Sequence, residues 1–271
     1  MSAAGNQQPR LARGDDRGAK VDAGNRTART LAIAVFIGIE SPDEEALRET
    51  KKYQNVRGSI LERVRRVQDA GLEVYAGMIV GFDSDDVGVF DRQFEFLSQA
   101  RIVGAMAGML SAIPRTPLYE RLEAVGRLDN AAADDPNIAT NVIPLGMTRE
   151  ELRDGWVGLM ERLYDPENYF ERFDALFTEG RIPLASAKMN WLRRNRPISY
   201  LKVQALTILA AVGILARVWA DPRTRPYRPV YARSLRRLLA ARRPPRYLFQ
   251  FVWKCVMHTH FATMTHQMAR G

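Results

Sequence analysis

Cysteine is nearly absent from this sequence, which contains only Cys255 in 271 residues. A single thiol excludes an intramolecular disulfide and fits a reducing compartment such as the cytosol. It also excludes a site in which three or four cysteines of this chain ligate an iron–sulfur cluster. No apolar run long enough for a signal peptide precedes Leu31, so we expect a cytoplasmic protein.

Acidic residues are outnumbered by basic ones, 31 Asp and Glu against 40 Lys and Arg, which gives a net charge of +9. A basic chain suits an anionic partner, either nucleic acid or a membrane surface. Hydrophobic residues make up 46% of the chain, which is enough for a sizeable core. Residues 1–29 contain almost no large apolar side chain, so we expect them to form a disordered basic tail.

Three short apolar runs, at residues 31–39, 74–81 and 102–113, each predict a buried parallel strand. Helical spacing of apolar residues lies between them, at 59–70 and 87–99, and a short helix is expected at 118–125. A further helix is expected after Pro42, because the acids that follow it suit a helix N-terminus. We therefore expect an α/β fold of βαβ units whose three strands form an incomplete sheet.

After about residue 145 the pattern changes to helices alone. Thr148 and Glu151 predict a capping box that opens a helix ending near Tyr164, and another helix is expected at 166–177. The apolar run at 206–216 is too short to span a bilayer comfortably, so we expect a helix that is buried or lies in a membrane surface. Basic helical patterns near 230–243 and 247–268 fit either a membrane surface or packing with solvated arginines.

Soft metal ligands are confined to the C-terminal helical pattern. Cys255 and His258 would share one helical face, whereas His260 points elsewhere. Because no second cysteine is present, we expect no metal site and interpret Cys255 and His258 as packed residues. No Ser-His-Asp arrangement and no Walker-type phosphate-binding motif occurs, so no catalytic residue is assigned.

The ends of the three predicted strands carry an ordered set of motifs: Ile37-Gly38-Ile39-Glu40-Ser41, Gly77-x-Ile79-x-Gly81 and Pro114-x-Thr116-Pro117-Leu118-Tyr119. This set resembles the later strands of the radical S-adenosylmethionine superfamily, in particular its cobalamin-binding branch. The helical part from about residue 145 resembles the C-terminal region of a subgroup that includes hopanoid 2-methyltransferase-like proteins.

The resemblance implies the C-terminal half of a β/α barrel of the TIM-barrel type at residues 30–145, followed by a helical domain at 146–271. It also implies that S-adenosylmethionine lies across the carboxyl ends of the strands. The implied contacts are the polar end or ribose of the cofactor with Glu40 and Ser41, and the adenine with the backbone of Gly77, Ile79 and Gly81 and with Ile113. The family often carries an acid soon after the second strand, and here Ser84 stands between Asp83 and Asp85.

The family further implies a [4Fe–4S] cluster held by a CxxxCxxC loop, and a cobalamin domain, for which this chain supplies no ligands. We therefore expect a truncated methyltransferase-like chain, inactive by itself, whose parent reaction is a radical methyl transfer with a polycyclic lipid as candidate acceptor. One alternative is a subunit completed by a separate chain that carries the missing N-terminal half. Another is a non-catalytic basic protein, peripheral at the inner membrane surface; no nucleic-acid partner is expected.

Overall fold

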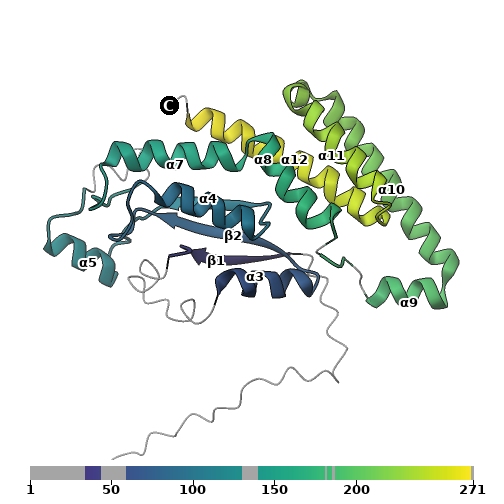
Figure 1. Ribbon diagram of the computed structural model, residues 1–271, viewed down its shortest axis with the longest axis horizontal. Helices are drawn as coiled ribbons and strands as arrows, with labels where there is room; N and C mark the ends of the chain where they lie inside the picture. The colour runs from purple at the N-terminus through teal and green to yellow at the C-terminus, as the bar shows by residue number, and fades with distance from the viewer. Residues whose placement is uncertain (1–33, 44–58, 130–139, 181, 185–186, 270–271) are drawn as a thin grey trace, which may run out of the picture. The chain divides into compact units, whose positions relative to one another are not determined.

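A computed structural model describes residues 34–43, 59–129, 140–180, 182–184 and 187–269. Contacts group residues 33–271 into one compact unit, in which strands and helices alternate before helices alone follow (Figure 1). The tail predicted at 1–29 and the helix expected after Pro42 lie outside the described residues. The domain boundary expected near residue 145 stays a prediction.

The sheet has three parallel strands in the order β1-β2-β3, which confirms the predicted α/β fold. The strands are β1 (Ala34–Glu40), β2 (Glu73–Val80) and β3 (Ala105–Met109), and the sheet is not closed within the described residues. The third strand is shorter than predicted because Arg101, with φ of 54°, and the residues after it belong to the turn that follows the preceding helix.

The two faces of the sheet are covered unequally. One face belongs to the main core, in which Val74, Ala76, Met78 and Val80 alternate along β2 and are 0–2% exposed. Helices α3 (Ile60–Asp69), α4 (Val89–Gln99) and α7 (Arg149–Leu163) contribute side chains to that core. The opposite face, formed by Phe36, Gly38, Tyr75, Gly77, Ile79, Met106 and Gly108, is called the open face here.

Two side chains of the open face lie in solvent to an unusual degree for a parallel sheet, whereas Tyr75 contacts Lys254 and Ile79 packs against a smaller core. Phe36 is 63% exposed and Met106 is 58% exposed. Parallel sheets normally have both faces covered, because their crossover connections place helices there. The open face is therefore the part of this fold with room for another group.

The remaining elements are helical, and most of them were predicted, whereas no helix was predicted at 187–195 or 222–227. They are α5 (Pro117–Ala124), α8 (Pro166–Phe173), a π-helical turn (Asp174–Thr178), α9 (Ala187–Asn195), α10 (Pro197–Ala220), a 3-10 turn (Pro222–Tyr227), α11 (Arg228–Ala240) and α12 (Pro245–Met268). The capping box of α7 is confirmed: the Glu151 N–H donates to the Thr148 hydroxyl at 3.1 Å, and the Thr148 N–H donates to the Glu151 carboxylate at 2.7 Å.

The prediction for residues 206–216 was wrong in length, and the buried helix offered as one interpretation was wrong as well. Helix α10 has 24 residues and is long and apolar enough to cross a membrane. Leu206 is 64% exposed and Leu209 is 69% exposed. The apolar run looked shorter because Lys202 and Gln204 interrupt it, whereas the helix passes through them and begins at Pro197, a residue tolerated in a first turn.

Candidate functional site at the carboxyl edge of the sheet

Residues from all three strands meet at the carboxyl edge of the sheet, because the strands run parallel. Along the open face, Gly38 lies opposite Gly77 and Ile79 lies opposite Gly108. The structure thus brings together the ends of β1 and β2, which carry Glu40, Ser41, Gly77, Ile79 and Gly81. Ile113 follows β3 and is 68% exposed. Binding of a cofactor by these residues stays a prediction.

Strand β1 ends in a strained turn at Glu40. The register shifts between Gly38 and Glu40, and Glu40 has φ of 68°, a left-handed conformation that is uncommon for a residue with a side chain. Ser41 is fully buried, and its N–H donates to the Ile39 carbonyl at 2.9 Å. The Ser41 hydroxyl accepts from the Asp43 N–H at 3.1 Å. These bonds hold the Glu40 backbone in place, and such local strain is often found at binding sites.

Glycines leave backbone uncovered on parts of the open face. A Cβ placed on Gly108 would meet nothing within 4 Å, whereas one on Gly77 would lie 2.9 Å from the Phe36 ring. Gly81, with φ of 97°, has a conformation that favours glycine. A flat group can therefore approach the backbone closely at Gly108, while the Phe36 ring fills the corresponding space at Gly77.

Asp85 is a buried carboxylate directly after β2. It is 2% exposed, and its Oδ2 accepts from the N–H groups of Gly81 at 2.8 Å and Phe82 at 3.0 Å. Burial raises the pKa of Asp85 to about 6, although the two N–H donors act in the opposite direction. Because it accepts these two N–H groups, the Asp85 carboxylate stabilises the turn at Gly81, which follows β2.

The neighbouring acids also have partners within the fold. Asp83 forms ion pairs with Arg127 at 2.7 Å and with Arg121 at 3.3 Å. Asp86 pairs with Arg92 at 2.9 Å, and this hydrogen bond lowers the pKa of Asp86. The position at which the resembled family places an acid is thus surrounded here by carboxylates that bind the chain's own arginines and amides.

Thr140 and Asn141 complete the edge beside β3, and the sequence did not single them out. Asn141 accepts from the Ala112 N–H at 2.8 Å and donates to the Ala112 carbonyl at 2.8 Å. The Thr140 hydroxyl donates to the Leu110 carbonyl at 2.5 Å. These side chains satisfy the backbone beyond β3, where a further strand would otherwise pair. In the sequence, the one local sign that these two residues are buried is that they precede the apolar Val142.

The Thr116-Pro117-Leu118-Tyr119 motif has a structural role at the start of α5. The Thr116 hydroxyl accepts from the Tyr119 N–H at 3.3 Å, and Pro117 occupies the first turn. Leu118 and Tyr119 pack against a second, smaller core that includes Phe82. This motif therefore positions α5 beside the carboxyl edge of the sheet.

No group of three or more His, Cys, Asp or Glu side chains is arranged to hold a metal ion in the part of the chain that the structure describes. Cys255 is fully buried in α12, and burial raises the pKa of its thiol well above the usual range. His258 is also fully buried; its Nδ1 accepts from the Tyr231 hydroxyl at 2.7 Å, and its Nε2 donates to the Tyr164 carbonyl at 3.1 Å. These residues pack rather than ligate, and they do not fit an iron–sulfur cluster.

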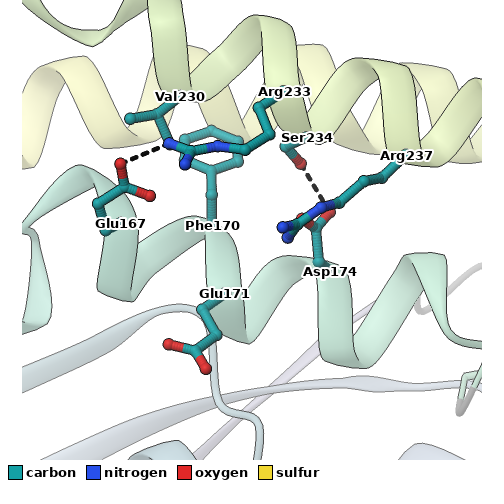
Figure 2. A pocket seen from close by; sticks show the side chains of 8 residues that line it. All are labelled: Glu167, Phe170, Glu171, Asp174, Val230, Arg233, Ser234 and Arg237. Atoms are coloured by element: carbon teal, nitrogen blue, oxygen red, sulfur yellow. Dashed lines mark hydrogen bonds and ion pairs between the residues drawn. The ribbon is translucent and has the colours of Figure 1, made fainter.

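A polar pocket of about 240 Å³ lies between α8 and α11 (Figure 2). Glu167 pairs with Arg233, and Asp174 pairs with Arg237 at 3.1 Å. The Ser234 hydroxyl donates to Asp174 at 2.7 Å. Figure 2 shows these side chains pointing toward one another across the two helices, so the pocket is better explained as a helix–helix junction than as a substrate site.

Comparisons with known proteins add a family and two relatives. The family model described as "Domain of unknown function (DUF4070)" matches residues 116–271. The chain is 41% identical over 143 residues to an uncharacterized methyltransferase of Synechocystis sp., and 36% identical over 140 residues to a hopanoid C-2 methylase of Rhodopseudomonas palustris. The matches cover 51% and 52% of this chain but 26% of each relative, so the chain spans about a quarter of their length. No solved structure matches.

Proposed function

The chain belongs to the family of the domain of unknown function DUF4070, and from that premise we propose that it forms the cofactor-facing part of a methyltransferase related to hopanoid C-2 methylase. The observation that supports this most directly is the carboxyl edge of the sheet, where the strained Glu40 turn, the buried Ser41 and uncovered glycine backbone adjoin an open face. The sequence similarity to two named methyltransferases supplies the reaction class.

In this proposal, S-adenosylmethionine is the group that occupies the open face, and when bound it supplies an activated methyl or adenosyl group. Glu40 and Ser41 would orient its polar end. The backbone around Ile79 and Gly81 would border the adenine, and the exposed Ile113 side chain would flank it. Gly108, which sequence analysis did not single out, offers the most open backbone on this face.

Radical chemistry needs ligands that these residues do not supply. The one cysteine is buried in α12, so the cysteines for a [4Fe–4S] cluster, and the cobalamin site, would have to lie outside the 271 residues. We propose that the 271 residues alone are therefore inactive and that a polycyclic lipid is the methyl acceptor of the complete enzyme. The alternative of a separate completing subunit is favoured by β1, which within the described residues pairs along one edge only.

Titration of S-adenosylmethionine into the purified chain, followed by calorimetry, tests the proposed site. Gly108→Val adds a side chain to the open face without a clash in the fold, and we expect it to weaken binding at least about tenfold. Ala34→Val is the matched control, because Ala34 lies opposite Glu73, at the other end of β1. Equal binding by wild type and Gly108→Val would contradict the proposed site.

Anaerobic reconstitution with iron and sulfide tests the proposed inactivity. We expect no stoichiometric iron and no 5′-deoxyadenosine from the chain alone. Activity that appears after addition of a second polypeptide with a CxxxCxxC loop would support the subunit alternative. Cleavage of S-adenosylmethionine by the chain alone would overturn the proposal.

A further inference from the structure

We propose that helix α10 lies in the surface of an anionic lipid bilayer, with its outward side chains among the acyl chains. This goes beyond the proposed function and does not depend on it. A protein that transfers no methyl group could use the same surface, and a vesicle-binding measurement requires no catalysis.

The packed side of α10 is polar toward its N-terminal end and apolar toward its C-terminal end. Helix α10 runs beside α12 in Figure 1 and contacts it. Its more buried positions recur at helical spacing. Three of them, Tyr200, Gln204 and Thr207, are polar and lie near the N-terminal end, whereas those nearer the C-terminal end are apolar: Ala211, Ile214, Leu215, Val218 and Trp219. Gln204 donates to the Tyr200 hydroxyl at 2.9 Å, and the Thr207 hydroxyl donates to the Val203 carbonyl at 2.8 Å, so these polar groups are satisfied within the helix.

The outward side of α10 is a row of large apolar side chains. Their exposed fractions are high: Ile198 70%, Leu201 64%, Leu206 64%, Leu209 69% and Val212 51%. A helix on the surface of a water-soluble protein carries mainly polar side chains on its outward side. A contiguous apolar surface of this kind marks contact with an apolar environment other than water.

Charge around α10 favours anionic lipid as that environment. Residues 187–220 contain six basic residues and no Asp or Glu; the basic residues are Lys188, Arg193, Arg194, Arg196, Lys202 and Arg217. Trp191, which is 53% exposed, stands before the helix, and Trp219 lies at its other end. Basic and Trp residues at the ends of an apolar surface are typical of the lipid headgroup region. Two copies of this chain would bring like charges together, which disfavours a dimer through α10.

The packing of α12 favours an orientation of α10 parallel to the membrane plane. Helix α12 lies along α10 and is tied to the sheet through Lys254, which pairs with Glu73 and donates to the Tyr75 hydroxyl at 2.6 Å. Because α12 is fixed to the sheet and α10 packs along it, α10 presents one side to its surroundings, as interfacial helices do. Helix α12 adds exposed Phe249, Trp253 and Val256 at helical spacing.

Flotation with lipid vesicles tests this inference on the full chain. We expect binding to phosphatidylglycerol-containing vesicles, weaker binding to pure phosphatidylcholine, and loss of binding as salt is raised. The double variant Leu206→Asn/Leu209→Asn should bind at least about tenfold more weakly, since both side chains leave the acyl region. Leu239→Asn on α11 is the matched control, because Leu239 is 59% exposed, and it should bind within about twofold of wild type.

Four outcomes would overturn the inference. They are an absence of binding to anionic vesicles, unchanged binding of the double variant, an equal loss in Leu239→Asn, and resistance of wild type to alkaline carbonate extraction, which would indicate a spanning helix. Sedimentation of the lipid-free chain supplies a further check: a dimer that Leu206→Asn/Leu209→Asn dissociates would assign the surface to a second copy. Circular dichroism of the variants controls for folding.

Discussion

Helices α10 and α12 have the same length, 24 residues, and pack against each other, yet they relate to the core in opposite ways. The more apolar helix, α10, has two buried residues, Ala211 and Val218. Helix α12 is interrupted by polar and charged residues, yet it buries ten side chains, with Lys254, His258 and Thr259 among them. Hydropathy alone would have predicted the reverse, with α10 buried in the core and α12 at the surface.

Specific partners explain why α12 is the buried helix. Lys254 is 0% exposed between Glu73 and the Tyr75 ring, whose centroid lies 4.5 Å from its ammonium nitrogen. His258 lies among Tyr169, Tyr227 and Tyr231, with ring centroids 4.9–5.6 Å away. A buried polar group is tolerated when its partners are built into the fold. Helix α10 has no such buried charge within the described residues, and nothing ties its outer side to the core.

Removal of the Lys254 charge should have the largest effect on this contrast. Lys254→Met leaves the buried Glu73 carboxylate without its counterion, and we expect a loss of about 3–5 kcal/mol in the free energy of unfolding. Chemical denaturation at pH 7 measures it. The double variant Glu73→Gln/Lys254→Met should recover much of the loss, because no buried charge remains. A single variant within about 1 kcal/mol of wild type would show that the pair does not hold α12 in place.

Acidification should destabilise the fold through His258. Burial lowers the pKa of His258 to about 4, below the value near 6.5 expected when the chain is unfolded. As pH falls from about 6.5 to 4, the unfolded chain takes up a proton that the folded chain excludes, so stability falls by at most about 3 kcal/mol. Denaturation at several pH values, in wild type and His258→Asn, measures this slope.

Asp85 provides the control for that pH series. Its raised pKa of about 6 has the opposite sign, since stability is lost as pH rises from about 4 through 6. The Asp85→Asn background removes this contribution and should steepen the loss on acidification. A slope that His258→Asn leaves unchanged would contradict the assignment to His258.

Removal of one hydroxyl group should show the same contrast between the core around α12 and the outer helix α10, with a smaller change in the free energy of unfolding. Tyr231→Phe removes the donor to His258 in the core, and we expect a loss of about 1–2 kcal/mol. The matched change beside α12, Tyr200→Phe on α10, removes the acceptor for the partly exposed Gln204 and should cost less than about 0.5 kcal/mol. Thermal or chemical denaturation compares them, and equal costs would remove this distinction between the helices.

Outward leucines of α10 should contribute least to folding in lipid-free buffer. Leu206→Ala should change the free energy of unfolding by no more than about 0.5 kcal/mol, because the side chain is already in water. Val252→Ala on α12 is the matched truncation at a fully buried position and should cost about 1–3 kcal/mol. A large loss in Leu206→Ala would mean that α10 packs more closely than the structure shows.

Local signals predicted much of this fold from sequence. The run at 74–81 and the capping box at Thr148 and Glu151 depend on neighbouring residues, and the structure confirms both within a residue or two. The parallel sheet followed from apolar runs that alternate with helical patterns, an order typical of βαβ units.

Interactions between distant residues were beyond sequence reasoning. Lys254 and Glu73 are 181 positions apart, and neither position carries a sign of its partner. Asn141 bonds the Ala112 backbone across 29 positions, so its role depends on the loop that returns it to the sheet. Helix α10 was underestimated for a different reason, since Lys202 and Gln204 interrupt its apolar run although the helix passes through both of them.

The left-handed turn at Glu40 implies a trade-off between folding and use. Glycine adopts this conformation freely, whereas a side chain there costs about 1–2 kcal/mol. Replacement of Glu40 by glycine would therefore raise the free energy of unfolding. If the Glu40 carboxylate orients a ligand, the same replacement would weaken ligand binding. Stability would then be gained at the place where the native chain carries its strain.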